Sequence, residues 1–546
     1  MGAMTETQHA TVLIVGGGTT GLSTALFLAR QGIRPILVER HPSTAIMPQA
    51  RAFNPRTMEI YRTLGLEEAI RARTSILADW PGMFGADTLA GEETFRLEMP
   101  GPDRPQVELG PTGWGLVDQD ELEEILHAEA ERHGADVRFG TEMISLDTDD
   151  DGVTAVVREL ASGTEYRVHA DYLVAADGNR AGIRGRLGVG ADELLSRTHS
   201  LFCVFDADLT DALRGRRFTL VYLNRPTTGT VLVPIRQEGR WMLGMPYYPE
   251  KGETQEGFTE ERCVELVRAA VGDPDLDATL VPPVPGWRQK VSFSTSGGWV
   301  AQRFRAGRVF FAGDAAHVMP PSGSYGASTG IADAHNLAWK LAAVLGGHAG
   351  EELLDTYEQE RGPVARTTVE QAIRLMSLRT GGTGDSAAEA ENLGVIYGYR
   401  YTSPAVLTEP STPDTPFEDP RTPTGRPGIR APHVNLKRDN ATPLSTLDLF
   451  TETFTLLTAK DGKDWHPAAT TAAKKLGLTL HVHHIGTDLQ DPDDRFETTY
   501  GLTPTGATLI RPDGFVAWRS PTLPTNPADT LHHTLTHLLH KPQPRA

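Results

Sequence analysis

The stretch that decides the fold is VLIVGGGTTGLSTALFLARQGIRPILVER, residues 12–40. Leucine and β-branched residues at 12–15 predict a strand buried on both faces, and a glycine triplet follows it directly. Gly16, Gly18 and Gly21 have G-x-G-x-x-G spacing, in which the first glycine permits a tight turn, the second a close approach of the backbone to a pyrophosphate, and the third close helix–strand packing. The stretch therefore predicts a Rossmann-type dinucleotide site with phosphate at a helix N-terminus.

The acid that follows the second predicted strand narrows the choice of dinucleotide. Glu39 ends the strand at 36–38, where a carboxylate can accept hydrogen bonds from both ribose hydroxyls. A 2′-phosphate at that place would be repelled, so NADP is disfavoured and FAD or NAD remains. Arg40, the next residue, is a further candidate contact of the cofactor.

Composition excludes several classes of partner. The 546 residues carry a formal net charge of -19, which argues against nucleic acid and anionic membrane surfaces, because both reward clustered Lys and Arg. Cys203 and Cys263 are the only cysteines, too few for a disulfide framework, and there is no secretory or membrane-spanning apolar run. We expect a cytoplasmic, soluble protein, monomeric or homodimeric, whose partner is a small molecule.

Patterning along the chain predicts an α/β and α+β protein of several parts. Alternating strand patterns between 201 and 296 favour a β-rich platform, and GRVFFAGDAAH then returns to a doubly buried strand. Residues 433–546 alternate β and α, which is typical of a compact α/β domain. We expect a dinucleotide-binding domain in two parts, the first at 1–185 with a small inserted sheet and the second at 297–402 with helices. A substrate-binding platform at 186–296 separates them. A Pro/Thr-rich connector at 403–432 then leads to the α/β domain at 433–546.

Three separated motifs together resemble one known family. They are GGGTTG with Glu39, ADGNRAGIR at 176–184, and AGDAAHVMPPSGSYGASTGIADAHNLAWKL at 312–341. The chain resembles the para-hydroxybenzoate hydroxylase family, the single-component (class A) flavoprotein aromatic monooxygenases. Its tail, with GLTPTGATLIRPDGFVAWRS at 501–520, resembles the thioredoxin-like C-terminal domain of phenol hydroxylase and of aromatic polyketide hydroxylases. The tail has no C-x-x-C, so thiol chemistry is excluded there.

The resemblance implies which residues hold FAD. Arg51 matches an arginine on the FAD phosphates, where a planar guanidinium offers bidentate donors. Gln119 matches a glutamine along the flavin, and a polar residue at a helix start is the alternative interpretation. Asp314 matches the acceptor of the ribityl hydroxyls. Further matching positions are Asp177 and Gly178 in the second motif, and Gly326, Ala327, Ser328 and Gly330 at the start of the helix that faces the flavin, with Pro321 and Gly323 lining the flavin and substrate cavity.

Candidate contacts of the other reactants are less specific. Arg180 and Arg184 are candidates for the phosphates of NADPH or NADH, which must visit a surface groove because no second G-x-G-x-x-G is present; ordinary solvated arginines are the alternative. Tyr222, Trp241, Met245 and Trp287 are candidate substrate contacts or ordinary core residues. The histidines at 481–484 and 533–540 lack Cys or acidic companions at ligand spacing, so no metal is expected.

The resemblance implies that NAD(P)H reduces FAD, that the reduced flavin traps dioxygen as a C4a-hydroperoxide, and that one oxygen passes to an electron-rich, polycyclic, phenolic ring of polyketide type. A Baeyer-Villiger or epoxidising oxygenase on the same fold is one alternative. A flavin-binding interaction protein without turnover is another, because Tyr325 and Ser328 replace the Gln or Lys and the Asn that relatives often carry. The sequence identifies no catalytic base.

Overall fold

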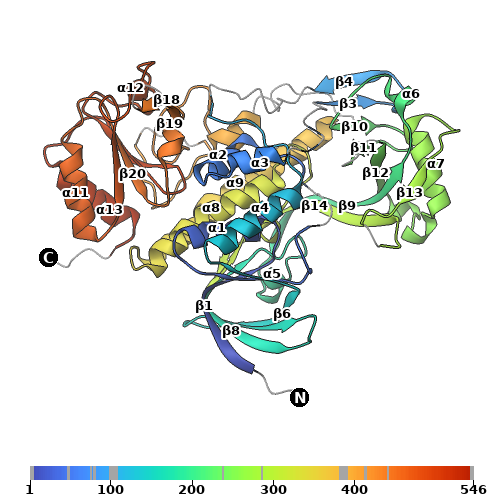
Figure 1. Ribbon diagram of the computed structural model, residues 1–546, viewed down its shortest axis with the longest axis horizontal. Coiled ribbons are helices and arrows are strands. Elements are labelled where there is room, and N and C mark those ends of the chain that lie inside the picture. The colour runs from blue at the N-terminus through green and yellow to red at the C-terminus, as the bar shows by residue number, and fades with distance from the viewer. Residues whose placement is uncertain are drawn as a thin grey trace.

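The computed structural model describes residues 5–45, 50–73, 75, 77, 82–97, 109–235, 239–284, 287–379, 392–410, 415–438 and 442–541. Figure 1 shows long helices at the centre of the molecule, with one β-rich lobe and one mixed lobe on either side of them. The N-terminal strand lies at the foot of the central part. The expected combination of α/β and α+β parts is confirmed.

The central part is built on a sheet whose core strands are parallel. β1 (Thr5–Val15) pairs in parallel with β2 (Ile36–Glu39) on one side and with β8 (Glu165–Ala175) on the other. Next to these lie β5 (Asp136–Phe139) and β16 (Val309–Phe311), also parallel. β16 enters more than 130 residues after β8, so the doubly buried strand predicted near 309 does return to the first sheet.

An antiparallel insert and a layer of helices complete this part. β6 (Thr141–Thr148) and β7 (Val153–Glu159) form a hairpin that adds to β8, as the alternating pattern predicted, and β15 (Arg305–Ala306) pairs with β16. Helix α1 (Thr19–Arg30) packs against both α4 (Gln119–Arg132) and α8 (Gly326–Leu345). The other helices here are α2 (Pro55–Thr63), α3 (Glu67–Ala72), α5 (Gly182–Arg186) and α9 (Thr356–Arg379).

The second lobe is a nine-stranded sheet, ordered β17-β14-β9-β12-β11-β10-β3-β4 with β13 also on β9. Most of its strands come from the predicted platform, but β3 and β4 come from the first segment of the chain and β17 from the segment after the platform, both of which the sequence assigned to the dinucleotide-binding part. The strand bounds are β3 (Met83–Ala86), β4 (Glu93–Leu97), β9 (Ala191–Asp206), β10 (Leu220–Leu223), β11 (Thr230–Pro234), β12 (Arg240–Tyr247), β13 (Thr279–Val281), β14 (Val291–Ala301) and β17 (His317–Val318).

Helix α7 (Glu260–Val271) covers one face of this sheet and α6 (Thr210–Leu213) lies at its edge. Apolar residues of α7 and of alternate strand positions form one core between helix and sheet. In Figure 1, α7 lies on the outer side, away from the central helices. The opposite face of the sheet is therefore turned toward the central part.

The C-terminal lobe has a four-stranded sheet in the order β21-β20-β22-β23. β20 (Phe454–Thr458) and β21 (Leu480–His484) are parallel around α11 (Trp465–Leu476), while β22 (Ala507–Ile510) and β23 (Val516–Ser520) form a hairpin before α13 (Pro527–Leu538). This β-α-β and β-β-α arrangement is that of a thioredoxin-like domain. A short hairpin, β18 (Asn435–Arg438) with β19 (Thr442–Ser445), and α12 (Phe496–Tyr500) complete it.

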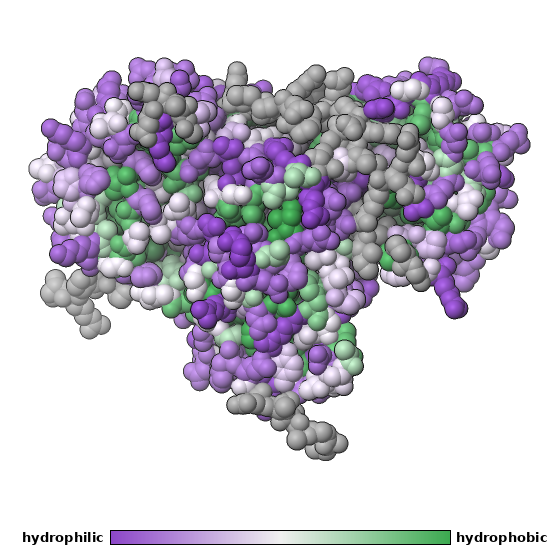
Figure 2. Space-filling view, viewed as in Figure 1, coloured by the Kyte–Doolittle hydropathy of each residue, from purple (hydrophilic) through white to green (hydrophobic). Residues whose placement is uncertain are grey.

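The surface is dominated by polar side chains. Figure 2 shows hydrophilic residues over most of the visible face, with apolar residues only in small patches between them. Among the described residues, no helix is both long enough and apolar enough to cross a bilayer.

Candidate active site

The glycine turn has the geometry that a bound pyrophosphate requires. Gly16 has a φ of +112°, and a Cβ on it would lie 2.1 Å from the Ala176 carbonyl oxygen. A Cβ on Gly21 would lie 1.9 Å from the Gly16 oxygen, so α1 could not pack this close to β1 with any other residue. The space beside Gly18 is open, with its nearest neighbour at 3.8 Å. Two glycines thus permit the turn, and the third leaves room in front of the helix N-terminus.

Glu39 lies beside this turn, as its place after β2 requires. Its carboxylate accepts a hydrogen bond from the Gly17 backbone N–H at 2.7 Å and another from the His41 backbone N–H at 2.8 Å. The carboxylate is therefore fixed at the edge of the turn where an adenosine ribose would lie. Arg40 is exposed.

Gln119 and Arg51 belong to one hydrogen-bonded cluster near the same turn. The Gln119 side chain accepts from the Ala50 backbone N–H at 3.0 Å and donates to Glu123 at 2.8 Å. Arg51 forms an ion pair with Asp118 at 2.8 Å and donates to the Pro234 carbonyl at 2.5 Å, at the end of β11. Arg51 thus joins the central part to the second lobe, and its guanidinium is already oriented by Asp118.

Glu123 is a residue of the site that sequence reasoning missed. It is buried on α4 and accepts from the Thr19 hydroxyl at 3.0 Å and from the Ala45 backbone N–H at 2.8 Å. Burial raises the pKa of Glu123, although these hydrogen bonds oppose the shift. A single Glu in an amphipathic helix gives no signal in the sequence, because it resembles the solvated acids around it.

Asp314 is the best candidate for holding a hydroxylated chain. It follows β16 and is exposed, and desolvation by the protein atoms around it raises its pKa. Within the described part of the chain no hydrogen bond to this carboxylate is found. A carboxylate that keeps its acceptor sites open in this way fits the ribityl hydroxyls of a flavin.

Asp177 lies next to the glycine turn from the other side. Its backbone nitrogen is near Gly16, one carboxylate oxygen accepts from the Ile183 backbone N–H at 2.9 Å, and the other is buried without a hydrogen-bond partner among the residues that the structure describes. Burial raises the pKa of this carboxyl group. The unpartnered oxygen is a place for a hydroxyl donor of the cofactor. Gly178, with a φ of +77°, has open space beside it.

The loop before α8 is fixed by Tyr325. A Cβ on Gly323 would lie 2.4 Å from the Tyr325 ring, and the phenol donates a hydrogen bond to the Asn392 side chain. Pro321 is exposed, and nothing lies within 4 Å of a Cβ on Gly326. Ala327 packs against the central core, and the buried Ser328 hydroxyl accepts from the Asn54 backbone N–H at 3.3 Å. Tyr325 therefore holds the loop in place through its ring and phenol, and the space beside Gly326 is open to a ring system.

The two candidate arginines for NAD(P)H differ. Arg180 is exposed in the turn after Asp177, and it stays a candidate contact. Arg184 donates to the Val189 carbonyl at 2.8 Å and lies 4.5 Å from the centre of the Trp299 ring. Burial lowers the pKa of this guanidinium. Its contacts therefore point to a structural role instead of a contact with phosphate.

The substrate candidates lie on different sides of the second sheet. Trp241 and Met245 are buried in the core beneath α7, and the Trp241 indole donates to the Ala207 carbonyl at 3.3 Å. They face away from the central part, which argues against substrate contact. Trp287 is 53% exposed outside the sheet. Tyr222 is on the opposite face, with its ring centre 6.3 Å from that of Phe95, and it alone of the four is turned toward the central part.

Comparison with known proteins agrees with this geometry. A family model described as an FAD binding domain matches residues 9–372, and one described as the C-terminal domain of aromatic-ring hydroxylases matches residues 424–542. The chain belongs to the family of FAD-dependent aromatic-ring hydroxylases. It is therefore an FAD enzyme, and the site residues above fit that cofactor.

Relatives and solved structures cover nearly all of the chain. Tetracenomycin A2 monooxygenase-dioxygenase of Streptomyces glaucescens is 41% identical over 98% of this chain and 97% of its own. A 4-methyl-5-nitrocatechol 5-monooxygenase of a Burkholderia species is 42% identical over 97% of both. The crystal structure of aklavinone-11 hydroxylase with FAD and aklavinone matches with a TM-score of 0.88 and 38% identity, over 98% of this chain and 100% of that one. The fold and all its parts are thus shared with monooxygenases.

Removing the Asp314 carboxylate is expected to weaken FAD binding. Hydrogen bonds to a charged group contribute about 1.5–3 kcal/mol, so Asp314→Ala should raise the Kd for FAD by roughly 10- to 150-fold. Stability of the FAD-free chain should be unchanged or higher, because none of the described residues forms a hydrogen bond to this carboxylate. Titration of the apoprotein with FAD measures the first quantity and denaturant unfolding the second. Asp171→Ala, at an exposed position of β8, is the control, and an equal effect there would contradict the assignment.

Proposed function

We propose that this protein hydroxylates a polycyclic, phenolic, polyketide-type aromatic compound with FAD, dioxygen and NADPH or NADH. In this reaction one oxygen atom enters the ring, the other leaves as water, and the nicotinamide supplies the two electrons. The observation that carries the proposal is the full-length match to a hydroxylase structure that holds FAD and aklavinone.

The open face of the second sheet supports a flat substrate. Gly85 and Gly244 lie on it, and a Cβ at either place would meet an aromatic ring, that of Phe95 at 2.2 Å and that of Phe202 at 2.8 Å. Because these two positions have no side chain, the rings of Phe95 and Phe202 can pack directly against the backbone of the sheet. Tyr222 continues this apolar surface. A planar aromatic compound packs well on such a surface, because offset ring stacking adds to the area buried.

The chain's own residues do three things for the reaction. The glycine turn, Glu39, Asp177 and Asp314 would hold FAD; when bound, FAD accepts hydride and activates dioxygen. The sheet face around Tyr222 holds the ring in place, since a fixed geometry lowers the entropic part of the barrier. Packing of the lobe on the central part excludes water from the reacting atoms.

The test follows NAD(P)H oxidation by the FAD-loaded enzyme with a panel of phenols. A polycyclic phenol should accelerate oxidation and gain one oxygen atom by mass, with the new phenol seen by NMR. A lactone or epoxide of the same mass would identify the Baeyer-Villiger or epoxidising alternative. Conversion of monocyclic phenols alone would overturn the polycyclic assignment. The panel includes them because one relative is named for a nitrocatechol, which has a single ring. Anaerobic reduction of FAD by NADPH and by NADH reports the preferred reductant. If neither reduces the flavin, the proposal that the protein catalyses an NAD(P)H-dependent oxygenation is wrong.

A further inference from the structure

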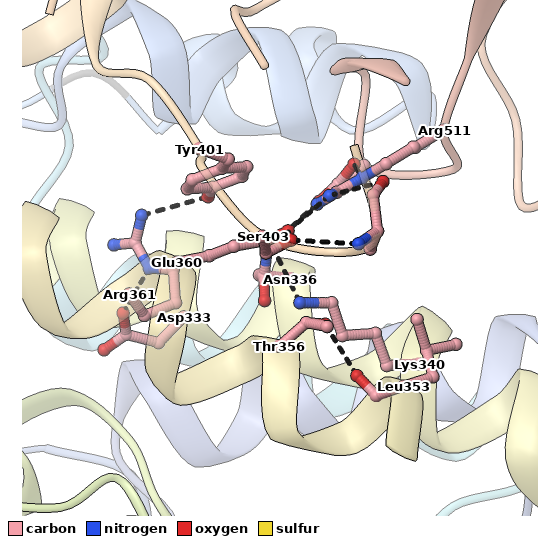
Figure 3. A network of polar contacts seen from close by, with 12 residues as sticks. Asp333, Asn336, Lys340, Leu353, Thr356, Glu360, Arg361, Tyr401, Ser403 and Arg511 are labelled. Carbon is pink, nitrogen blue, oxygen red and sulfur yellow. Dashed lines mark hydrogen bonds and ion pairs between the residues drawn. The ribbon is translucent and has the colours of Figure 1, made fainter. Parts of the chain in front are cut away.

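We propose that Arg511, a residue of the C-terminal domain, is a positioning residue for FAD. It acts through a buried charge network that ends at Gly313–Asp314 and at the first turn of α8. We call this set the junction network; its members are Asp333, Asn336, Lys340, Glu360, Arg361, Ser403, Arg511 and Asp513. Figure 3 shows that the network joins α8, α9, the connector and the C-terminal domain.

Arg511 is a long cation fully buried at the junction. Its two terminal nitrogens donate to the two oxygens of Glu360 at 2.6 and 2.9 Å, and its Nε donates to Asp513 at 3.0 Å. The guanidinium also lies 5.2 Å from the ring centres of Trp339 and of Tyr401. The bidentate fork and the two neighbouring aromatic rings together restrict the position of the guanidinium.

Glu360, on α9, links Arg511 to helix α8 of the FAD-binding domain by hydrogen bonds. It accepts further hydrogen bonds from Lys340 at 2.8 Å and Asn336 at 2.7 Å, both on α8, and from Ser403 at 2.6 Å in the connector. The two carboxylate oxygens are therefore shared by donors of α8, the connector and the C-terminal domain. Any displacement of Glu360 along α9 breaks several of these bonds at once.

The adjacent residue on α9 reaches the FAD site. Arg361 donates to Asp333 at 2.7 Å and to the Thr329 carbonyl at 3.2 Å, one residue beyond Ser328. The other Asp333 oxygen accepts from the Gly313 backbone N–H at 3.0 Å and contacts His317 at 2.7 Å. Gly313 directly precedes Asp314. The position of the proposed ribityl acceptor therefore depends on Arg361, and through α9 on Glu360 and Arg511.

Charge balance explains why the network needs a residue from the C-terminal domain. Arg511, Lys340 and Arg361 neutralise three acids, Glu360, Asp333 and Asp513, and all six side chains are essentially inaccessible. Without Arg511, two cations would face three anions in a dry interior, where an unpaired charge is strongly unfavourable. Lys340 and Arg361 would then be drawn toward Glu360, and Asp333 would lose its fixed partner. The C-terminal domain, which has no cysteine, thus supports the FAD site electrostatically.

The test compares two variants of the C-terminal domain in the full-length protein. Arg511→Met removes the charge and the fork, while Leu535→Ala removes apolar core contacts of α13 and leaves every charged and polar side chain of the network in place. We expect Arg511→Met to raise the Kd of the apoprotein for FAD at least tenfold and to shift the visible absorption bands of bound flavin. Both variants should lower the denaturation midpoint by similar amounts. The Kd of Leu535→Ala for FAD should nevertheless stay within twofold of the wild-type value.

Equal FAD affinities in the two variants would overturn the proposal and leave Arg511 as a domain anchor only. If Arg511→Met does not fold, Arg511→Lys replaces it, because lysine keeps the charge but cannot form the fork to Glu360. That variant should bind FAD several-fold more weakly than wild type, and wild-type affinity with an unchanged flavin spectrum would again overturn the proposal. Since FAD affinity is measured without substrate, this result does not depend on the proposed hydroxylation.

Discussion

Gly21→Ala is expected to give a chain that no longer retains FAD on purification. The alanine methyl group would lie 1.9 Å from the Gly16 carbonyl oxygen, far inside van der Waals contact. That oxygen belongs to the backbone of the turn, so relief requires α1 to move away from β1. The helix N-terminus then no longer faces the pyrophosphate. Overpacking of this kind costs about 3 kcal/mol, so the Kd for FAD should rise by about 100-fold or more.

Gly32→Ala is the matched control, since it adds the same methyl group just after the same helix. Gly32 has a φ of +80°, but nothing lies within 4 Å of its Cβ position. The substitution should cost about 1 kcal/mol of stability through backbone strain alone and leave FAD affinity near the wild-type value. Flavin absorbance per chain and titration of the apoprotein measure both variants. Tight FAD binding by Gly21→Ala would contradict the assigned role of this turn.

The sequence predicted those features that depend on local geometry. Gly16 and Gly21 could be assigned because each must be glycine for a steric reason that the motif itself encodes. Glu39 followed from its place at the end of a strand. Helices such as α11 and α13 were also predictable, because each has one apolar face.

Strand patterns did not reveal which face of the second sheet is turned toward the FAD-binding domain. Trp241 and Tyr222 both occur in alternating stretches, yet their side chains lie on opposite faces of one sheet. The choice between the faces depends on where α7 packs, and that is a tertiary contact. The same holds for β3 and β4, which join this sheet from the first segment of the chain.

Helices were expected within 297–402, but the position and length of α9 and the junction network were not predicted. α9 contains Pro363, a residue that normally ends a helix, and its buried face carries polar and charged residues such as Glu360 and Arg361, so no apolar stripe marks it in the sequence. Glu360 and Arg511 are 151 residues apart, and each alone reads as an ordinary surface charge. Only the fold brings these charges together in a dry interior, which is why no pattern along the chain could indicate them.

Glu360→Gln is expected to destabilise the protein by about 3–5 kcal/mol, the range found when one partner of a buried ion pair is removed. Glutamine has nearly the same shape, so the loss reflects charge. Arg511 and Lys340, both inaccessible to solvent, would lose the anion they share. Denaturant unfolding measures the effect. Glu265→Gln is the control, because Glu265 pairs with Arg262 at 3.0 Å on the exposed side of α7, and surface pairs contribute about 0–1 kcal/mol.

The dependence of stability on pH separates charge from packing at this site. Burial opposes ionisation of Glu360, but Arg511 and Lys340 more than offset it, so its pKa lies well below the ordinary value of 4.5. A carboxyl group whose pKa is lowered by folding contributes stability that is present above its unfolded pKa and is lost as pH falls below that value. The wild-type protein should therefore lose more unfolding free energy than Glu360→Gln between about pH 5 and pH 3. Parallel pH profiles for the two proteins would mean that Glu360 is not ionised in the fold, and the charge balance of the junction network would then be wrong.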